Sequence, residues 1–180
     1  MHEDSSQPLL LVPNGYPLWI DVPQASIDGA GTAMRFELPL NGHNLPLLHR
    51  RERKLVVALQ GSLELRVGRQ CIARLRPGEA VLVPAGTAHR IHQHGSQPST
   101  VGAVLWPGRV EEAFRELATA ATGSGYGRRT MVEILACYEV EWTAGAHDSE
   151  AEPLQVVTMA EGLVHLPEVL ARAVVRVWAD

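Results

Sequence analysis

Histidine is the residue type that makes one part of this chain a candidate for chemistry. Of the eight histidines in the 180-residue sequence, five fall between residues 43 and 94, with Lys54 among them. Imidazole nitrogens bind divalent transition metals and exchange protons near neutral pH, and a buried lysine can hold an anion. The five are His43, His49, His89, His92 and His94. The first four are candidate site residues, whereas His94 lies in a polar run and is expected in an exposed loop.

These side chains need a framework of strands, and the sequence contains a turn and strand pattern that provides one. Pro77-Gly78 predicts a turn, because proline presets φ and glycine tolerates positive φ. The apolar run over residues 80–83 favours a buried strand, and a second turn leads into another strand over 87–92. Because side chains alternate along a strand, His89 is expected to point to one face and His92 to the other.

Two groups of residues resemble the conserved motifs of the cupin superfamily. The second cupin motif is matched by a glycine, a proline, a glycine and a histidine at the family's intervals: Gly78, Pro84, Gly86 and His89. The first motif is matched by Gly42, His49 and Gly61, and the resemblance covers about residues 30–106. It implies a mainly β fold, an antiparallel β-barrel of the jelly-roll type, followed by C-terminal α-helices like the helical tail of a group of bacterial cupins.

The chain departs from the cupin pattern where the family usually binds a metal. When Gly61 is aligned with the family's turn glycine, Lys54 falls at the usual glutamate ligand and Leu47 at the first histidine. An ammonium group in place of a carboxylate repels a divalent cation unless burial removes its proton. For Lys54 the simplest expectation is a stem that packs while the ammonium reaches water.

The resemblance implies that His49 and His89 are the two ligands that remain. They would hold iron, manganese, zinc, nickel or copper, with His43 or His92 as the candidate third ligand. Two protein ligands make a weak site, since most catalytic sites keep three. We therefore expect no metal cofactor, with His49 and His89 retained as hydrogen-bonded residues of a polar barrel mouth.

Three functions stay open, because a fold does not determine an activity. The first is a small-molecule-binding cupin with a degenerate metal site, in a sensor or accessory role, with its ligand at His49, Lys54 and His89. The second is a metal-dependent oxygenase or isomerase with His49 and His89 as metal ligands. The third is a metal-free isomerase or epimerase in which His49 is the base and Lys54 stabilises an enolate. His49 and Lys54 are thus the candidate catalytic residues.

Composition excludes several partners. A net charge of −4 and a pI near 6.1 argue against binding to nucleic acid or an anionic membrane. The polar, acidic first residues predict no signal peptide, and no apolar stretch approaches the ~20 residues of a membrane span. Cys71 and Cys137 are expected to be buried and reduced, which favours a cytoplasmic location.

The chain is expected to comprise three segments. These are an N-terminal arm with short extended pieces (1–29), the cupin barrel (30–106) and a helical C-terminal extension (107–180), with helices over 110–121, 129–138 and 166–178. The strand that begins at Lys54 is apolar on both faces, so terminal segments or another subunit should cover the outside of the barrel. The arm is expected to close a barrel edge or cross to a second subunit, and on that basis we predict a homodimer.

Overall fold

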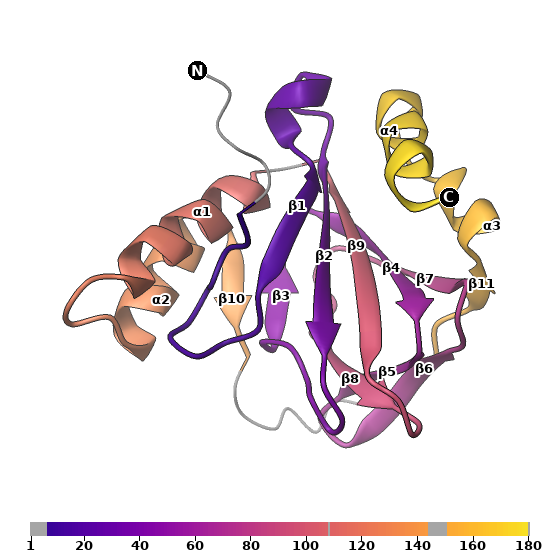
Figure 1. The fold of residues 1–180 in the computed structure, drawn as a ribbon, viewed down its shortest axis with the longest axis horizontal. Coiled ribbons are helices and arrows are strands. Elements are labelled where there is room, and N and C mark those ends of the chain that lie inside the picture. The colour runs from indigo at the N-terminus through magenta and orange to yellow at the C-terminus, as the bar shows by residue number, and fades with distance from the viewer. Residues whose placement is uncertain (1–6, 108, 144–150, 180) are drawn as a thin grey trace.

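Short antiparallel strands joined by turns build a barrel, with helices packed on two of its sides (Figure 1). A computed structural model describes residues 7–107, 109–143 and 151–179. Parts of the predicted arm and of the predicted C-terminal extension therefore lie outside the described residues. The division into three segments stays a prediction.

Three sheets contain all the strands of the described residues. The large sheet has the order β1 (Leu18–Val22), β2 (Thr32–Leu38), β9 (Ser99–Trp106), β4 (Arg53–Gln60), β7 (Glu79–Val83) and β11 (Val156–Thr158). The second sheet has the order β6 (Gln70–Leu75), β5 (Ser62–Val67) and β8 (Arg90–His94), and a two-stranded sheet joins β10 (Val140–Trp142) to β3 (Leu47–His49). Every strand pair is antiparallel, which confirms the predicted antiparallel barrel.

One 3-10 helix and four α-helices complete the fold of the described residues. They are the 3-10 helix Gln24–Ile27, α1 (Val110–Ala121), α2 (Arg128–Cys137), α3 (Met159–Leu163) and α4 (Glu168–Trp178). The predicted helices over 110–121, 129–138 and 166–178 are confirmed to within two residues at each end. The C-terminal extension also contains two strands, β10 and β11, which the sequence pattern did not predict.

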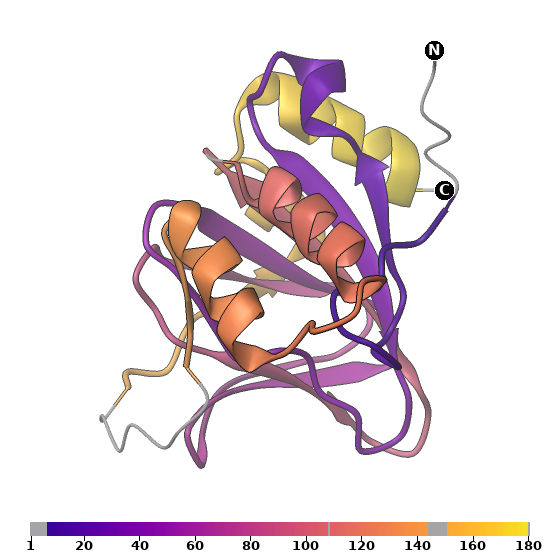
Figure 2. The same cartoon turned by 90° about the vertical axis from the view of Figure 1, so that its left-hand side faces the viewer.

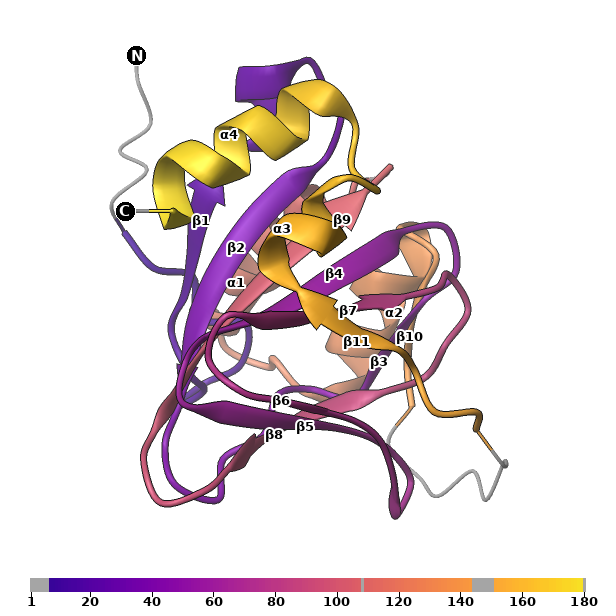
Figure 3. The ribbon, with the colours of Figure 1, turned by 90° about the vertical axis from the view of Figure 1, so that its right-hand side faces the viewer.

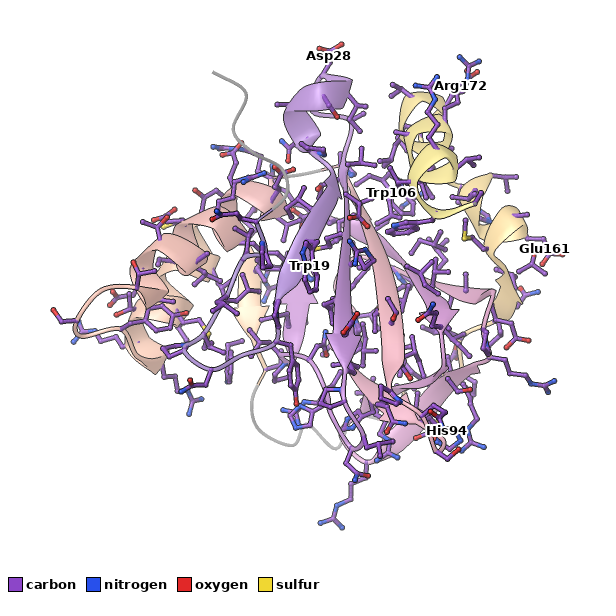
Figure 4. The ribbon with its side chains drawn as sticks, in the orientation of Figure 1. Trp19, Asp28, His94, Trp106, Glu161 and Arg172 are labelled. Atoms are coloured by element: carbon purple, nitrogen blue, oxygen red, sulfur yellow. The ribbon has the colours of Figure 1, made fainter. Side chains whose placement is uncertain are left out.

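Strand β4 is buried on both faces, as its apolar pattern predicted. Val56 and Ala58 belong to the core inside the barrel, on the face that also carries Lys54. Leu55 and Val57 face outward into a second apolar cluster, which Leu170 and other residues of α4 complete. Figure 3 shows α3 and α4 over this outer side of the large sheet, and Figure 4 shows Trp106, a member of the same cluster, between the sheet and α4. The cover on the outside of the barrel is therefore a terminal segment of the same chain.

Helices α1 and α2 lie along another side of the barrel (Figure 2). Helix α1 presents Phe114 and Leu117 to the inner core, at the spacing of one helical face, and α2 adds Met131 and Leu135. After α2 the chain returns as β10, which pairs with β3 so that Val140 lies opposite His49. The helical pair is thereby attached to the strand that carries His49.

The two cysteines do not lie where the sequence predicted them. Both cysteines lie at the surface, so the expectation that they are buried is wrong. Each occupies the exposed side of its element, Cys71 on β6 and Cys137 at the end of α2.

No helix among the described residues is both long and apolar enough to cross a membrane.

Candidate ligand-binding site

Lys54 and His89 meet in the interior of the barrel. Lys54 comes from β4 and His89 from the segment just before β8, and their side chains are buried, with residue exposures of 6% and 4%. Nζ of Lys54 lies 3.1 Å from Nε2 of His89. The expectation that the ammonium of Lys54 reaches bulk water is therefore wrong.

The hydrogen bonds around His89 fix its tautomer. Nδ1 of His89 lies 3.0 Å from the carbonyl oxygen of Thr87, which can only accept, so Nδ1 carries the proton. Nε2 then has a free lone pair, and it accepts from the ammonium of Lys54. The turn before His89 is held by Gly86, whose φ of 79° suits glycine and whose N–H donates to the carbonyl of His49 at 2.8 Å. One turn thus positions both histidines.

Burial lowers the pKa values of both members of this pair, and the charge of Lys54 lowers that of His89 further. Burial lowers the pKa of Lys54 to about 8. Burial, and then the charge of Lys54, lower the pKa of His89 to about 3, against the opposing effect of its hydrogen bond to Thr87. No carboxylate in the described part of the chain forms an ion pair with Lys54. At neutral pH the site therefore holds a neutral imidazole and an ammonium without a counterion.

His49 lies near Lys54 and faces a buried carboxyl group. Its Nδ1 is 3.9 Å from Oε2 of Glu52, and neither atom has a hydrogen-bond partner among the described residues. Burial, followed by the charges of Lys54 and His89, lowers the pKa of His49 well below its usual value. Burial also raises the pKa of Glu52. Nothing in the sequence singled out Glu52, which lies between arginines in the chain and matches no position of the cupin motifs.

A cavity of about 200 Å³ opens beside these residues, and both Lys54 and His49 line it. His89 does not line the cavity, but it contacts Lys54, which does. Most of the wall is apolar, with contributions from β1, β2, β9 and α1, among them Leu18, Met34, Phe36, Leu105 and Phe114. The segment before β1 closes one side with Leu11 and Tyr16, which sequence reasoning did not connect with the site.

The other two candidate histidines lie apart from Lys54 and His89. His43 lines the cavity, but its ring faces that of His92, with centroids 5.3 Å apart, and its Nδ1 lies 3.1 Å from the carbonyl oxygen of Asn44. His92 pairs across the strands with Glu64 on the outward face of the smaller sheet, as alternation predicted. Partial burial, and then the charge of Arg66, lower the pKa of His92 to about 4.

His94 occupies the same outward face at the far end of β8 (Figure 4). Its Nδ1 lies 3.3 Å from Glu64, which also accepts hydrogen bonds from Arg66 and Arg74. This cluster lies outside the barrel, and it takes no part in the cavity. His94 belongs to β8 rather than to a loop, contrary to the expectation.

The residues at the site do not fit a metal ion. No three histidine, cysteine, aspartate or glutamate side chains of the described residues lie close enough together to hold one. The lone pair of His89 that a metal would need already accepts from Lys54. An ion bound there would also lie against an ammonium group, which the low-dielectric interior makes strongly repulsive.

Comparison with known families agrees with this fold. The family model described as "Cupin domain" matches residues 34–106, which include the sheet strands that carry Lys54 and the turn before His89. Together with the antiparallel barrel, this match identifies residues 34–106 as a cupin domain. A search of curated proteins found no match.

Solved structures similar to this chain include several bacterial proteins. TT1209 from Thermus thermophilus is 26% identical, with a TM-score of 0.40, over 44% of this chain and 74% of that protein. The polyketide cyclase RemF from Streptomyces resistomycificus is 19% identical, with a TM-score of 0.47, over 58% and 75%. A sugar phosphate isomerase of the cupin superfamily from Silicibacter pomeroyi is 21% identical, with a TM-score of 0.42, over 51% and 59%. At this level of similarity the neighbours do not identify a ligand.

Proposed function

We propose that this cupin binds a small, mainly apolar molecule in the cavity beside Lys54, without a metal ion, in a sensor or accessory role. The observation that carries the proposal is the uncompensated ammonium of Lys54 in an apolar wall. A buried charge is costly unless it is paired. A ligand oxygen from a carboxylate or carbonyl group would supply the missing partner, and the apolar body of the ligand would replace water along the remaining wall.

The size of the cavity supports a ligand of modest dimensions. An apolar cavity of roughly 150 Å³ accommodates benzene. The cavity here measures about 200 Å³ and adds polar groups at Lys54, His49 and Asn44. A molecule with one small ring or a short branched chain and one polar head matches this shape and chemistry.

Benzoate is a suitable first probe, because it combines one apolar ring with one carboxylate. We expect saturable binding to the wild-type protein by calorimetry, with the same affinity in the presence of EDTA. Lys54→Met should weaken binding at least tenfold, since it keeps the stem and removes the charge. Arg53→Met is the matched control, because it removes a positive charge from the neighbouring, exposed position of β4 and should leave affinity unchanged.

Metal analysis separates this proposal from the metal-dependent oxygenase or isomerase. Elemental analysis of untagged protein should find no stoichiometric transition metal, before or after incubation with iron, manganese, zinc, nickel or copper salts. One bound metal per chain, lost in the double variant His49→Ala/His89→Ala together with benzoate binding, would overturn the proposal in favour of the metal-dependent enzyme.

A second candidate function is the metal-free isomerase or epimerase, and the position of His49 beside Lys54 in the cavity wall favours it. His49 is held neutral beside Lys54, so it can take a proton from a carbon atom next to a carbonyl group. The ammonium of Lys54 would stabilise the resulting enolate. The test is deuterium exchange at C3 of 2-oxo-4-methylpentanoate in D₂O: exchange above the buffer rate that His49→Gln abolishes supports catalysis, and exchange at the buffer rate leaves only binding.

A further inference from the structure

Lys54 is the only lysine in the chain. Of the 16 lysine and arginine residues, the other 15 are arginines. Arginine therefore provides every other side-chain cation, including all those in ion pairs with carboxylates among the described residues. The one primary amine carried by a side chain lies inside the barrel, in the wall of the cavity. An amine can lose its proton and act as a nucleophile, which a guanidinium cannot do in a protein.

The surroundings of Nζ suit nucleophilic chemistry at that atom. It lies 3.1 Å from a nitrogen of His89 that can only accept, and no carboxylate of the described chain pairs with it to hold it in the charged form. Burial in an apolar wall favours the neutral amine, as the lowered pKa of about 8 reflects. His49 lines the same cavity and is a neutral imidazole, so it can carry protons between the reacting atoms.

We propose that Lys54 forms an imine with small apolar aldehydes or ketones that enter this cavity. The inference rests on the proposed function and deepens it, because it assigns the polar head of the ligand to a carbonyl group and makes the attachment covalent. The apolar wall would hold the carbon body of the ligand, and the carbonyl carbon would meet Nζ.

The reaction is a balanced condensation that needs no oxidant or reductant. The neutral amine of Lys54 attacks the carbonyl carbon, so that an N–C bond forms while one proton passes from Nζ to the carbonyl oxygen through His49. The carbinolamine then takes up a proton, its C–O bond breaks, and the oxygen leaves as water. Counted from the ammonium form, Lys54 and the carbonyl compound yield an iminium and one water. The iminium keeps a single N–H, which can continue to donate to Nε2 of His89.

Reductive trapping with benzaldehyde tests this inference, and the composition of the chain makes the result easy to assign. The only competing primary amine is the α-amino group of the chain. Protein incubated at pH 7.5 with benzaldehyde and sodium cyanoborohydride should gain one benzyl group at Lys54, located by peptide mapping. A pKa of about 8 in place of about 10.4 raises the neutral fraction at pH 7.5 roughly two hundredfold. Labelling of Lys54 should therefore be at least about tenfold faster in the folded protein than in urea.

Lys54→Arg is the matched control, since it keeps the positive charge and cannot form an imine; it should gain no label except at the α-amino group. If that variant does not fold, the comparison of native with urea-unfolded wild type still decides the question. Labelling of the α-amino group alone, or equal rates at Lys54 with and without urea, would overturn the inference. Benzoate binding without a trapped adduct would leave the proposed function standing and remove only the imine. If the protein shows neither benzoate binding nor a trapped adduct at Lys54, both proposals are contradicted.

Discussion

Nζ of Lys54 donates to Nε2 of His89 across 3.1 Å, and among the described residues this neutral ring is the one hydrogen-bond partner of the buried ammonium. A neutral acceptor satisfies one N–H and leaves the charge unbalanced. The pair therefore lowers the stability of the folded chain whenever Lys54 is protonated. This loss of stability fits a lysine that serves ligand binding rather than folding. It can be detected in measurements of the free energy of unfolding.

Replacing Lys54 with methionine should remove a pH dependence of stability. The pKa of Lys54 is about 8 in the folded protein and about 10.4 in an unfolded chain. Between these values the unfolded chain binds more protons than the folded protein, so the free energy of unfolding rises with pH, by at most about 3 kcal/mol. Urea unfolding from pH 7 to pH 10.5 should show this rise in wild type relative to Lys54→Met. At pH 7 the variant should be the more stable protein. Parallel pH profiles for the two proteins would contradict the buried ammonium.

His89 should stay neutral and carry its proton on Nδ1. The pKa of about 3 in the folded protein lies below the value of about 6.5 in an unfolded chain, so the unfolded chain binds the extra proton first as the pH falls. Stability from this group is therefore lost as the pH falls from about 6.5 towards 3. Nitrogen NMR of labelled protein, assigned with His89→Gln, should show a neutral Nδ1–H ring at pH 5. A protonated ring at that pH, or the Nε2–H tautomer, would contradict the hydrogen bonds to Thr87 and Lys54.

The barrel could be predicted because the sequence patterns that indicate it are local. Turn residues, alternation and the two-faced apolar pattern of β4 each act within a few residues, and His89 and His92 take opposite faces as alternation requires. The helix α1 was likewise readable from the spacing of its apolar side chains.

The cavity could not be predicted in the same way, because residues far apart in the chain form it. Tyr16 in the N-terminal segment and Phe114 in α1 share a wall with Lys54, and β10 pairs beside His49 from a distant part of the chain. Only the cupin resemblance placed Lys54 near His89, and it supplied no contact between them. The exposure of Cys71 was also mispredicted, because alternation along β6 turns Ile72 into the core and leaves Cys71 on the outer face.

Replacing Glu52 with glutamine should stabilise the protein at neutral pH. The carboxyl group is 3% exposed, its Oε2 has no partner in the described structure, and burial raises its pKa. The folded protein therefore holds this proton more strongly than the unfolded chain, so wild type loses stability as the pH rises above 4.5, and glutamine does not. Thermal unfolding at pH 4 and pH 7 checks this: the advantage of Glu52→Gln should be present at pH 7 and smaller at pH 4. An equal effect at both values would mean that the pKa of Glu52 is the same in the folded and unfolded states.

A mutation in α4, which covers the outside of the barrel, should change stability without changing ligand binding in the cavity. Leu170 of α4 is fully buried and packs in the cluster that contains Leu55, whereas Val169, one position earlier, is 49% exposed. Leu170→Ala should cost about 2–5 kcal/mol, because it removes buried contacts and leaves a void under the helix. Val169→Ala should change stability by less than about 0.5 kcal/mol. Urea unfolding measures both.

Benzoate affinity at low urea provides the second measurement on the same two variants. Leu55 and Lys54 are adjacent on β4 and point to opposite faces, so a void behind the sheet leaves the cavity wall in place. Leu170→Ala should therefore bind benzoate like wild type in spite of its lower stability. A parallel loss of affinity and stability would mean that α4 positions Lys54 through the strand, in which case the extension would be part of the binding site and more than a cover for the barrel.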